Sequence, residues 1–438
     1  MNTLDRLALR TLAWECAGLV LAMHLATPAS AGTKAAPVAT SPIFRACANA
    51  LDHSSTSIHE DDGRQTLTVK LNGAQCAIDF RLEGKAQFDE DFTDLVSLPA
   101  NGRLRLDVRD GDERRQLEIE PGRDGLTRNW KVNGQERPYD DAARAWFAAF
   151  LIELDRRTAV GVERRLPVLL RKGGVAAVLD ETGQMSSDYA RGVYYSKLAE
   201  ATRLSSGDVV RVLDQAATLK TSDYYAAELM KSVGARAGEA DVRSAMLRLI
   251  QSMSSDHYQA ESVKQVVGSG RLGAPEMDLL IGAMQHMESD YYKTEVLKQL
   301  LAAGKTDAAQ RKKLALLASD IHEDSYAHEF VKALAASRDA GPGQARALID
   351  AAATIQSDYY LSESVAAILA NPALTEGDLL AIVKMAPPTK SEYYRSETLR
   401  RVLAHRATTD AVRRAVLDAS GGMSSYYREE VEKASGMR

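Results

Sequence analysis

The stretch Ser222-Asp223-Tyr224-Tyr225 decides the fold of this chain, because it recurs. Copies and near-copies place their first residue at 187, 222, 255, 289, 323, 357, 391 and 424, at spacings of 35, 33, 34, 34, 34, 34 and 33 residues. A fixed period of about 20–50 residues is typical of a solenoid of supersecondary units. One period fits two helices of about 13 residues with short turns. The spacing therefore predicts an α-solenoid of two-helix repeats over residues 187–438, which we expect to be right-handed.

The residue types in each unit agree with this prediction. Serine favours a helix N-cap, because its hydroxyl accepts a hydrogen bond from a free amide of the first turn, and the aspartate after it suits the positive helix end. Positions 9 and 12 of the units are apolar, as at Leu297 and Leu300. A single unit cannot bury this apolar stripe, so the units must stack.

The remaining motif positions are tyrosines and glutamates. Thirteen of the 16 tyrosines occupy positions 3 and 4, and position 7 is nearly always glutamate, often followed three residues later by Lys or Arg. The tyrosines would either form an exposed stripe that binds an extended partner or pack between units; both hold if one ring of each pair faces out. The candidate residues are Tyr224, Tyr225, Tyr258, Tyr291, Tyr292, Tyr326, Tyr359, Tyr360, Tyr393, Tyr394, Glu228, Glu261, Glu295, Glu329, Glu363 and Glu397.

The N-terminal third of the chain has a different organisation. Residues 1–31 have the pattern of a cleavable signal peptide, cut after Ala31, which predicts a periplasmic or secreted protein. Residues 32–44 read as a flexible lead-in. In an oxidising compartment Cys47 and Cys76 would form a disulfide, with two buried thiols as the alternative.

Residues 45–137 alternate with period two and contain turn signals such as Asn72-Gly73 and Asn133-Gly134. They predict a small antiparallel β-sheet with one apolar face. Residues 138–186 predict linking helices and a degenerate first repeat. The fold class is therefore α+β by modules, and mainly α.

Several functions are disfavoured by composition and motif content. A net charge of −5 gives no reason to expect nucleic-acid binding, and no long apolar run after the signal predicts a membrane span. His322 and His328 are six residues apart and do not match the H-E-x-x-H zinc pattern, so we expect them to be exposed. We expect no catalytic residues, metal or cofactor.

Three blocks also resemble a known group of bacterial proteins: NGRLRLDVRDGDERRQLEIEPGRDGLTRNWKVNGQERPYDDAARAWFAAFL, then RKGGVAAVLDETGQMSSDYARGVYYSKL, then the S-D-Y-Y repeats. Their order is similar to exported proteins and to the extracytoplasmic region of some BlaR-type membrane metallopeptidases. The resemblance spans roughly residues 60–438 and implies a β-module followed by HEAT-like repeats. The peptidase motif is missing, so it implies no catalysis. A tetratricopeptide-like array is the second choice.

The function expected from the sequence is protein binding or scaffolding, with envelope sensing or regulation as a possible form of it. Solenoids present long surfaces that suit protein partners. One alternative is glycan binding, with tyrosines as stacking platforms. The other is a hydrolase of envelope polymers that uses repeat glutamates as acid and base, which needs two carboxylates at a defined separation in a cleft.

Overall fold

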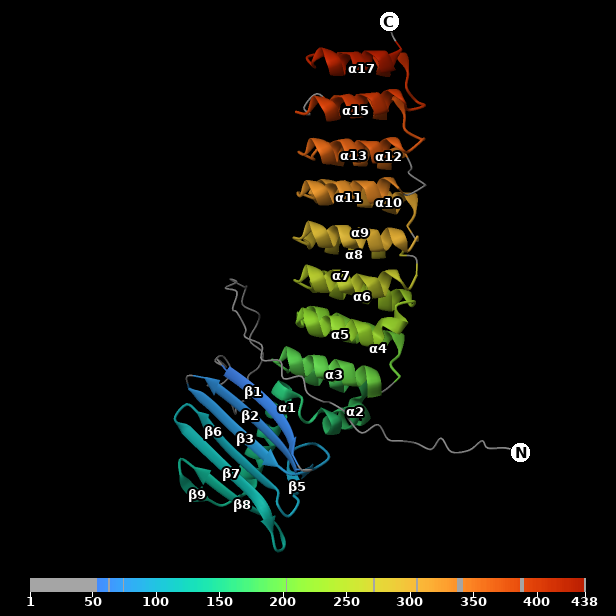
Figure 1. Cartoon of the computed structure of the whole chain (residues 1–438). Coiled ribbons are helices and arrows are strands. Elements are labelled where there is room, and N and C mark those ends of the chain that lie inside the picture. The colour runs from blue at the N-terminus through green and yellow to red at the C-terminus, as the bar shows by residue number, and fades with distance from the viewer. Residues whose placement is uncertain are drawn as a thin grey trace, which may run out of the picture. The chain divides into compact units, whose positions relative to one another are not determined.

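The computed structural model describes residues 53–61, 64–73, 75–201, 203–270, 272–304, 306–336, 342–386 and 390–436. It contains an antiparallel sheet followed by an array of α-helices, as the sequence predicts (Figure 1). The proposed signal peptide, the lead-in and Cys47 lie outside the described residues. No helix in the described part of the chain is both long and apolar enough to cross a membrane.

The main sheet is an antiparallel meander with strand order β1-β2-β3-β6-β7-β8-β9, and β4 pairs with β5 in a separate ribbon. The strands are β1 His53–Asp61, β2 Arg64–Gly73, β3 Cys76–Glu83, β4 Gln87–Phe88, β5 Leu95–Ser97, β6 Arg103–Asp110, β7 Glu113–Gly122, β8 Gly125–Val132 and β9 Gln135–Arg137. The predicted turn at Asn133-Gly134 is confirmed, because both residues have positive φ (48° and 79°), as a type I′ turn requires. The turn predicted at Asn72-Gly73 is wrong in register: β2 continues through Gly73, so the chain reverses after it.

Period-two alternation produces the apolar face of this sheet. Val69, Phe80 and Leu106, on neighbouring strands, are buried on that face. Helix α1, Asp141–Thr158, covers it, and Phe150 of α1 lies 5.9 Å from Phe80 between ring centroids. The helix expected to link the two modules therefore belongs to the core of the sheet.

Seventeen α-helices are described, and eight of them are motif helices. Each motif helix begins one residue after the first motif position, as expected for a cap followed by a helix. The helices after α1 are α2 Val162–Thr182, α3 Asp188–Ala201, α4 Ser206–Thr218, α5 Asp223–Val233, α6 Ala240–Ser252, α7 Asp256–Val267, α8 Ala274–His286, α9 Asp290–Ala302, α10 Ala308–Leu316, α11 Asp324–Ala335, α12 Pro342–Ala352, α13 Asp358–Leu369, α14 Glu376–Met385, α15 Glu392–Leu403, α16 Asp410–Ala419 and α17 Ser425–Ser435.

These helices form two stacked layers. The odd-numbered motif helices from α3 to α17 pack one on the next, and the even-numbered helices from α4 to α16 do the same (Figure 1). The predicted apolar positions, such as Leu297 and Leu300, are buried between the layers in one continuous core. Stacking therefore buries the stripe that one unit alone would leave in water.

Candidate binding surface

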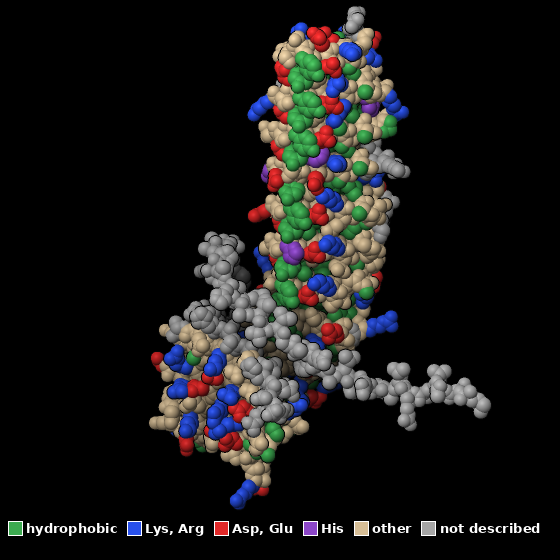
Figure 2. Space-filling model, in the orientation of Figure 1, with side chains coloured by type: hydrophobic (Ala, Val, Ile, Leu, Met, Phe, Trp, Pro, Cys, Tyr) green, Lys and Arg blue, Asp and Glu red, His purple; other side chains and the backbone are tan. Residues whose placement is uncertain are grey.

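The third motif position faces solvent along one edge of the helical array. Six tyrosines there expose between 46% and 67% of their surface: Tyr189, Tyr224, Tyr291, Tyr359, Tyr393 and Tyr426. His257 and Ser325 hold the same position in α7 and α11. We call these eight residues the rungs. Figure 2 shows a hydrophobic stripe along this edge of the array, interrupted by histidine.

The fourth motif position is half-buried. Its tyrosines are Tyr225, Tyr258, Tyr292, Tyr326, Tyr360, Tyr394 and Tyr427. Rings such as Tyr258 and Tyr292 pack against the core between the layers. Burial also raises the pKa of Tyr225 above its ordinary value, because the phenolate would lose hydration. One tyrosine of each pair thus faces inward and its neighbour faces outward.

Rungs and half-buried tyrosines alternate in a zigzag, which we call the aromatic ladder. Within a unit the two ring centroids lie 5.0 Å apart, as for Tyr224 and Tyr225. Each aromatic rung also contacts the half-buried ring of the following unit, as for Tyr224 and Tyr258, whose centroids lie 6.3 Å apart. Ring contacts of this kind run without a break from Tyr189 to Tyr326. Most are edge-to-face, the geometry that aromatic quadrupoles favour.

The ladder lacks an aromatic rung in its middle. The rung Ser325 has no ring, so no aromatic rung stands between Tyr326 and Tyr360. His328 contacts Tyr360 instead, at 5.6 Å between ring centroids, and its Nδ1 lies 3.0 Å from the Ser364 hydroxyl. The expectation that His328 is exposed was wrong, because it is half-buried and burial lowers its pKa. His322 is exposed, as expected.

Close approach between units depends on a glycine at the start of the ladder. A Cβ on Gly192 of α3 would lie 2.7 Å from the ring of Tyr225, closer than real Cβ atoms come. The ring of α5 therefore rests directly on the backbone of α3. No other side chain at position 192 leaves that ring in place.

From the second unit onward, the second motif position links each unit to the next. Asp290 accepts hydrogen bonds from the amides of His322 and Glu323, both at 2.8 Å. Asp223, Asp256, Asp324 and Asp358 likewise accept from two amides each, and Glu392 accepts from the amide and the hydroxyl of Ser424; the donors lie 31 to 33 residues further along the chain. We call these six contacts the carboxylate clamps. They are charge-assisted hydrogen bonds, about twice as strong as neutral ones.

The clamps correct the predicted role of the motif serine. A hydroxyl N-cap forms at Ser187 and Ser357. The hydroxyls of the other motif serines, as at Ser255 and Ser289, make no such bond to the first turn. At those serines, except Ser222, the backbone amide of the serine donates to the clamp carboxylate of the preceding unit, and this bond holds the start of the helix. The aspartate is therefore the residue that ties the units together, and sequence spacing alone did not show its distant partner.

The candidate glutamates form a row of ion pairs one helical turn beyond the rungs. Glu228, Glu261, Glu295 and Glu397 pair with the basic residue three positions on, at 2.5–3.3 Å. Glu329 pairs with Lys298 of the preceding unit, and Glu363 with Arg401 of the next. The predicted pairs at i and i+3 are thus confirmed at four positions. Each candidate glutamate is held by a cation at the surface.

A second polar cluster lies where α1, α2 and α3 meet. Asp155 is fully buried and accepts hydrogen bonds from the Gly161 amide at 2.6 Å, from Arg165 at 2.7 Å and from the Tyr194 hydroxyl at 2.5 Å. Arg165 also pairs with Glu181 at 2.9 Å. Burial raises the pKa of Tyr194 above its ordinary value. This cluster joins the degenerate first repeat to its neighbours and is closed to solvent.

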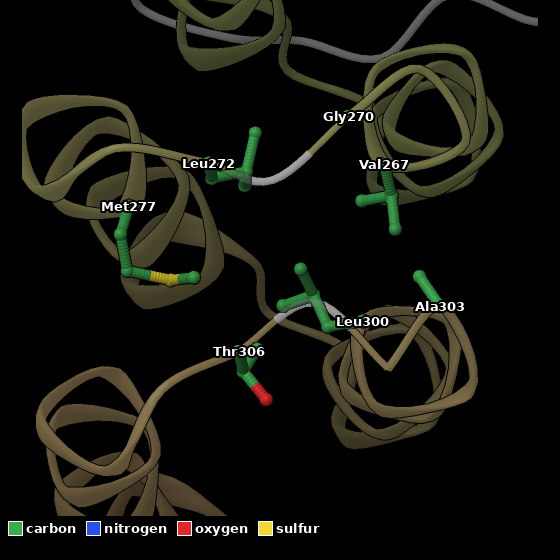
Figure 3. Close-up of a pocket in the computed structure, with 7 residues that line it drawn as sticks. All are labelled: Val267, Gly270, Leu272, Met277, Leu300, Ala303 and Thr306. Atoms are coloured by element: carbon green, nitrogen blue, oxygen red, sulfur yellow. The ribbon is translucent and has the colours of Figure 1, made fainter.

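Two hollows lie away from the ladder. A depression of about 950 Å³ lies on the polar face of the sheet, where Arg105 pairs with Glu118 and Asp107 pairs with Arg114. A second space between α7, α9 and the start of α8 is about 10 Å³, and the side chains of Val267, Leu272 and Leu300 point into it (Figure 3). It has room for about one water molecule and is mostly apolar. Neither hollow offers a chemistry as distinctive as the ladder.

Comparison with known proteins adds little to this description. No protein-family model and no curated protein matches the chain. Six solved chains match, among them one described as "Computational Design of Self-Assembling Cyclic Protein Homooligomers", at 12% identity over 61% of this chain and 90% of that chain, with a TM-score of 0.14. A TM-score that low supports no argument about fold or function. The similarity to BlaR-type extracytoplasmic regions stays a prediction.

Proposed function

We propose that this chain is an exported, non-catalytic scaffold that binds an extended polypeptide along its aromatic ladder. One observation carries the proposal: outward-facing rings recur unit after unit along one edge of a regular stack. Tyrosine is among the residues that contribute most to protein interfaces. A contiguous row of exposed rings is typical of an interaction surface, whereas single exposed rings are ordinary.

The aromatic rings at the rungs are not needed for packing between the helices. Position 4 carries tyrosine in every unit from Tyr225 to Tyr427, and most of these half-buried rings pack against the core between the helix layers. Position 3 varies, since His257 and Ser325 replace tyrosine while α7 and α11 keep their places in the stack. A ring at position 3 is therefore not required for stacking, which leaves contact with a partner as its use.

The hydrolase alternative has less support. Acid and base catalysis by a carboxylate pair needs one group kept protonated and a substrate cleft. Each candidate glutamate, such as Glu228 or Glu363, is instead bound to a Lys or Arg at the surface. The glycan alternative uses the same rings, so binding experiments must separate it from the peptide reading.

The proposed function is tested by photo-crosslinking at the rungs. A benzophenone amino acid replaces Tyr291 or, separately, Tyr359, and the protein is exposed to a library of unstructured peptides mixed with soluble oligosaccharides. The same residue at Asp107, on the sheet, is the control. We expect peptide adducts at both rungs and few at Asp107. Oligosaccharide adducts would establish the glycan alternative, and equal labelling at all three positions would remove the ladder as a site.

Export and the disulfide form part of the same proposal. Cys76 is fully buried at the start of β3. We propose that it forms a disulfide with Cys47, which lies outside the described residues. Mass spectrometry of the unreduced protein from cells tests both points: we expect an N-terminus at Gly32 and a peptide that links Cys47 to Cys76. An intact N-terminus in the cell interior would contradict export.

A further inference from the structure

We propose that the polypeptide bound by the aromatic ladder is a proline-rich, basic segment in the polyproline II conformation, with one turn of three residues on each rung. This rests on the proposed function and adds the conformation and composition of the ligand. Three features of the ladder carry it: its period, its hydroxyl groups and its carboxylates.

The period of the rungs matches polyproline II. Stacked helices lie about 8–10 Å apart. Two successive rungs, such as Tyr224 and His257, both contact the half-buried ring of Tyr258. The ring centroids are 6.3 Å apart for Tyr224 and Tyr258 and 5.2 Å apart for Tyr258 and His257. The distance between the two rung rings therefore cannot exceed the sum of these two distances. A polyproline II helix repeats the same face every three residues, about 9 Å. A β-strand repeats it every two residues, about 6.8 Å, and loses register within a few units.

The exposed hydroxyls suit a backbone with free carbonyls. The hydroxyls of Tyr224, Tyr291 and Tyr359 make no hydrogen bond to the part of the chain that the structure describes. A polyproline II backbone has no internal hydrogen bonds, and proline supplies acceptors but no N–H donor. Tyrosine hydroxyls can donate to those carbonyls. Two turns of an α-helix span about 10.8 Å, which is also close to the rung spacing, but the carbonyls of an α-helix already accept hydrogen bonds within the helix.

In the unit of Tyr224, two carboxylates stand nearer to the rung along the helix than the cation of that unit does. The clamp carboxylate of Asp223 reaches the amide of Ser255, two residues before His257, so it lies between two successive rungs. Glu228 stands one turn after Tyr224, and its partner Lys231 stands a further turn away. This order favours a cationic residue between the prolines of the ligand and disfavours an acidic one.

The gap at Ser325 sets the length of the ligand. The uninterrupted half of the ladder carries four rungs: Tyr189, Tyr224, His257 and Tyr291. Four rungs at three residues each accept a segment of about twelve residues. We therefore expect affinity to rise with peptide length up to about four turns and to level off beyond.

Fluorescence anisotropy with the purified protein tests the inference. The probe is a labelled (Pro-Pro-Arg)4 peptide, and the controls are (Gly-Ser-Arg)4, (Pro-Pro-Glu)4 and a helix-forming peptide of the same charge. We expect (Pro-Pro-Arg)4 to bind at least about tenfold more tightly than any control. Tyr224→Ala and Tyr291→Ala should each weaken binding about three- to tenfold, as expected for loss of one aromatic contact, whereas Arg105→Ala on the sheet should not.

The outcomes separate the inference from the proposed function. If (Gly-Ser-Arg)4 binds as well as (Pro-Pro-Arg)4, or if the helical peptide binds better, polyproline II recognition is refuted while peptide binding at the ladder stands. If (Pro-Pro-Glu)4 binds equally, the assigned charge is wrong. If (Pro-Pro-Arg)4 fails but the peptide library crosslinks to Tyr291, only the inference falls. If no peptide binds in either experiment, both fall.

Discussion

Asp155→Ala probes the buried polar cluster, and its effect can be worked from the contacts. The substitution removes the acceptor for Gly161, Arg165 and Tyr194 in a site closed to water. Breaking a buried ion pair costs about 3–5 kcal/mol, mainly because a charge is left unpaired. In this variant Arg165 still forms its ion pair with Glu181, at 2.9 Å, so the guanidinium charge remains paired. We therefore expect a loss of about 3 kcal/mol, the low end of that range.

Urea denaturation followed by far-ultraviolet circular dichroism measures this loss. The matched control is Asp107→Ala, which removes an aspartate paired with Arg114 on the open face of the sheet. Exposed pairs contribute at most about 1 kcal/mol. Asp155→Asn, which keeps the shape and part of the hydrogen bonding, should fall between the two. Equal losses for Asp155→Ala and Asp107→Ala would show that burial of the carboxylate does not decide the cost.

Three further substitutions address the backbone, the ladder and acid stability. Gly174→Ala should cost about 1–3 kcal/mol in urea denaturation, because φ 63° and ψ −153° at this break in α2 suit glycine alone. Gly192→Ala should displace Tyr225, lower stability by about 1–3 kcal/mol and change the near-ultraviolet circular dichroism of tyrosine. Arg236 lowers the pKa of Glu239 from 4.5 to about 2. A lowered pKa means that its contribution is complete above about pH 4.5 and is lost as pH falls toward 2, so Glu239→Gln should lower the urea midpoint near neutral pH and have little effect at the acid end of that window.

Each of these predictions has an outcome that would contradict it. Gly207→Ala serves as the glycine control, because its Cβ would meet only the Ser205 hydroxyl at 3.9 Å and its φ is not positive; we expect no loss there. If Gly174→Ala or Gly192→Ala behaves like Gly207→Ala, the strain or the ring contact is absent. If Glu239→Gln lowers stability equally at neutral and acid pH, the ion pair is not the cause.

The repeat architecture was predictable because each unit carries its own local signals. A cap residue, an acidic first turn and an apolar stripe recur at a fixed period, so the motif helices begin where the sequence placed them. In the sheet, the strands with clear alternation were found. The edge strand β1, with sequence HSSTSIHED, lies within the predicted sheet but lacks clear alternation, because it is a polar stretch with one isoleucine.

The candidate surface was predictable only in part. The sequence marked both tyrosines of each pair but could not say which faces out, since this depends on how one helix lies on the next. Tyr224 and Tyr225 are chemically identical, and only the stack distinguishes them. For the same reason the motif aspartate was assigned to its own helix end, whereas Asp290 binds amides of the following unit. Contacts between residues 31 to 33 positions apart can be assigned only when the stacking of the units is known.

The carboxylate clamps give the array a direction. In each clamp the acceptor belongs to the earlier unit and the amides to the later one, as from Asp256 to Ser289. A unit therefore needs its predecessor to hold its first turn, but does not need its successor. Chains are synthesised from the N-terminus, and early segments fold first. From α7 onward, every new turn thus meets a carboxylate already in place. Assembly would therefore proceed from α5 toward α17, and truncation from the C-terminus should leave the remaining units folded.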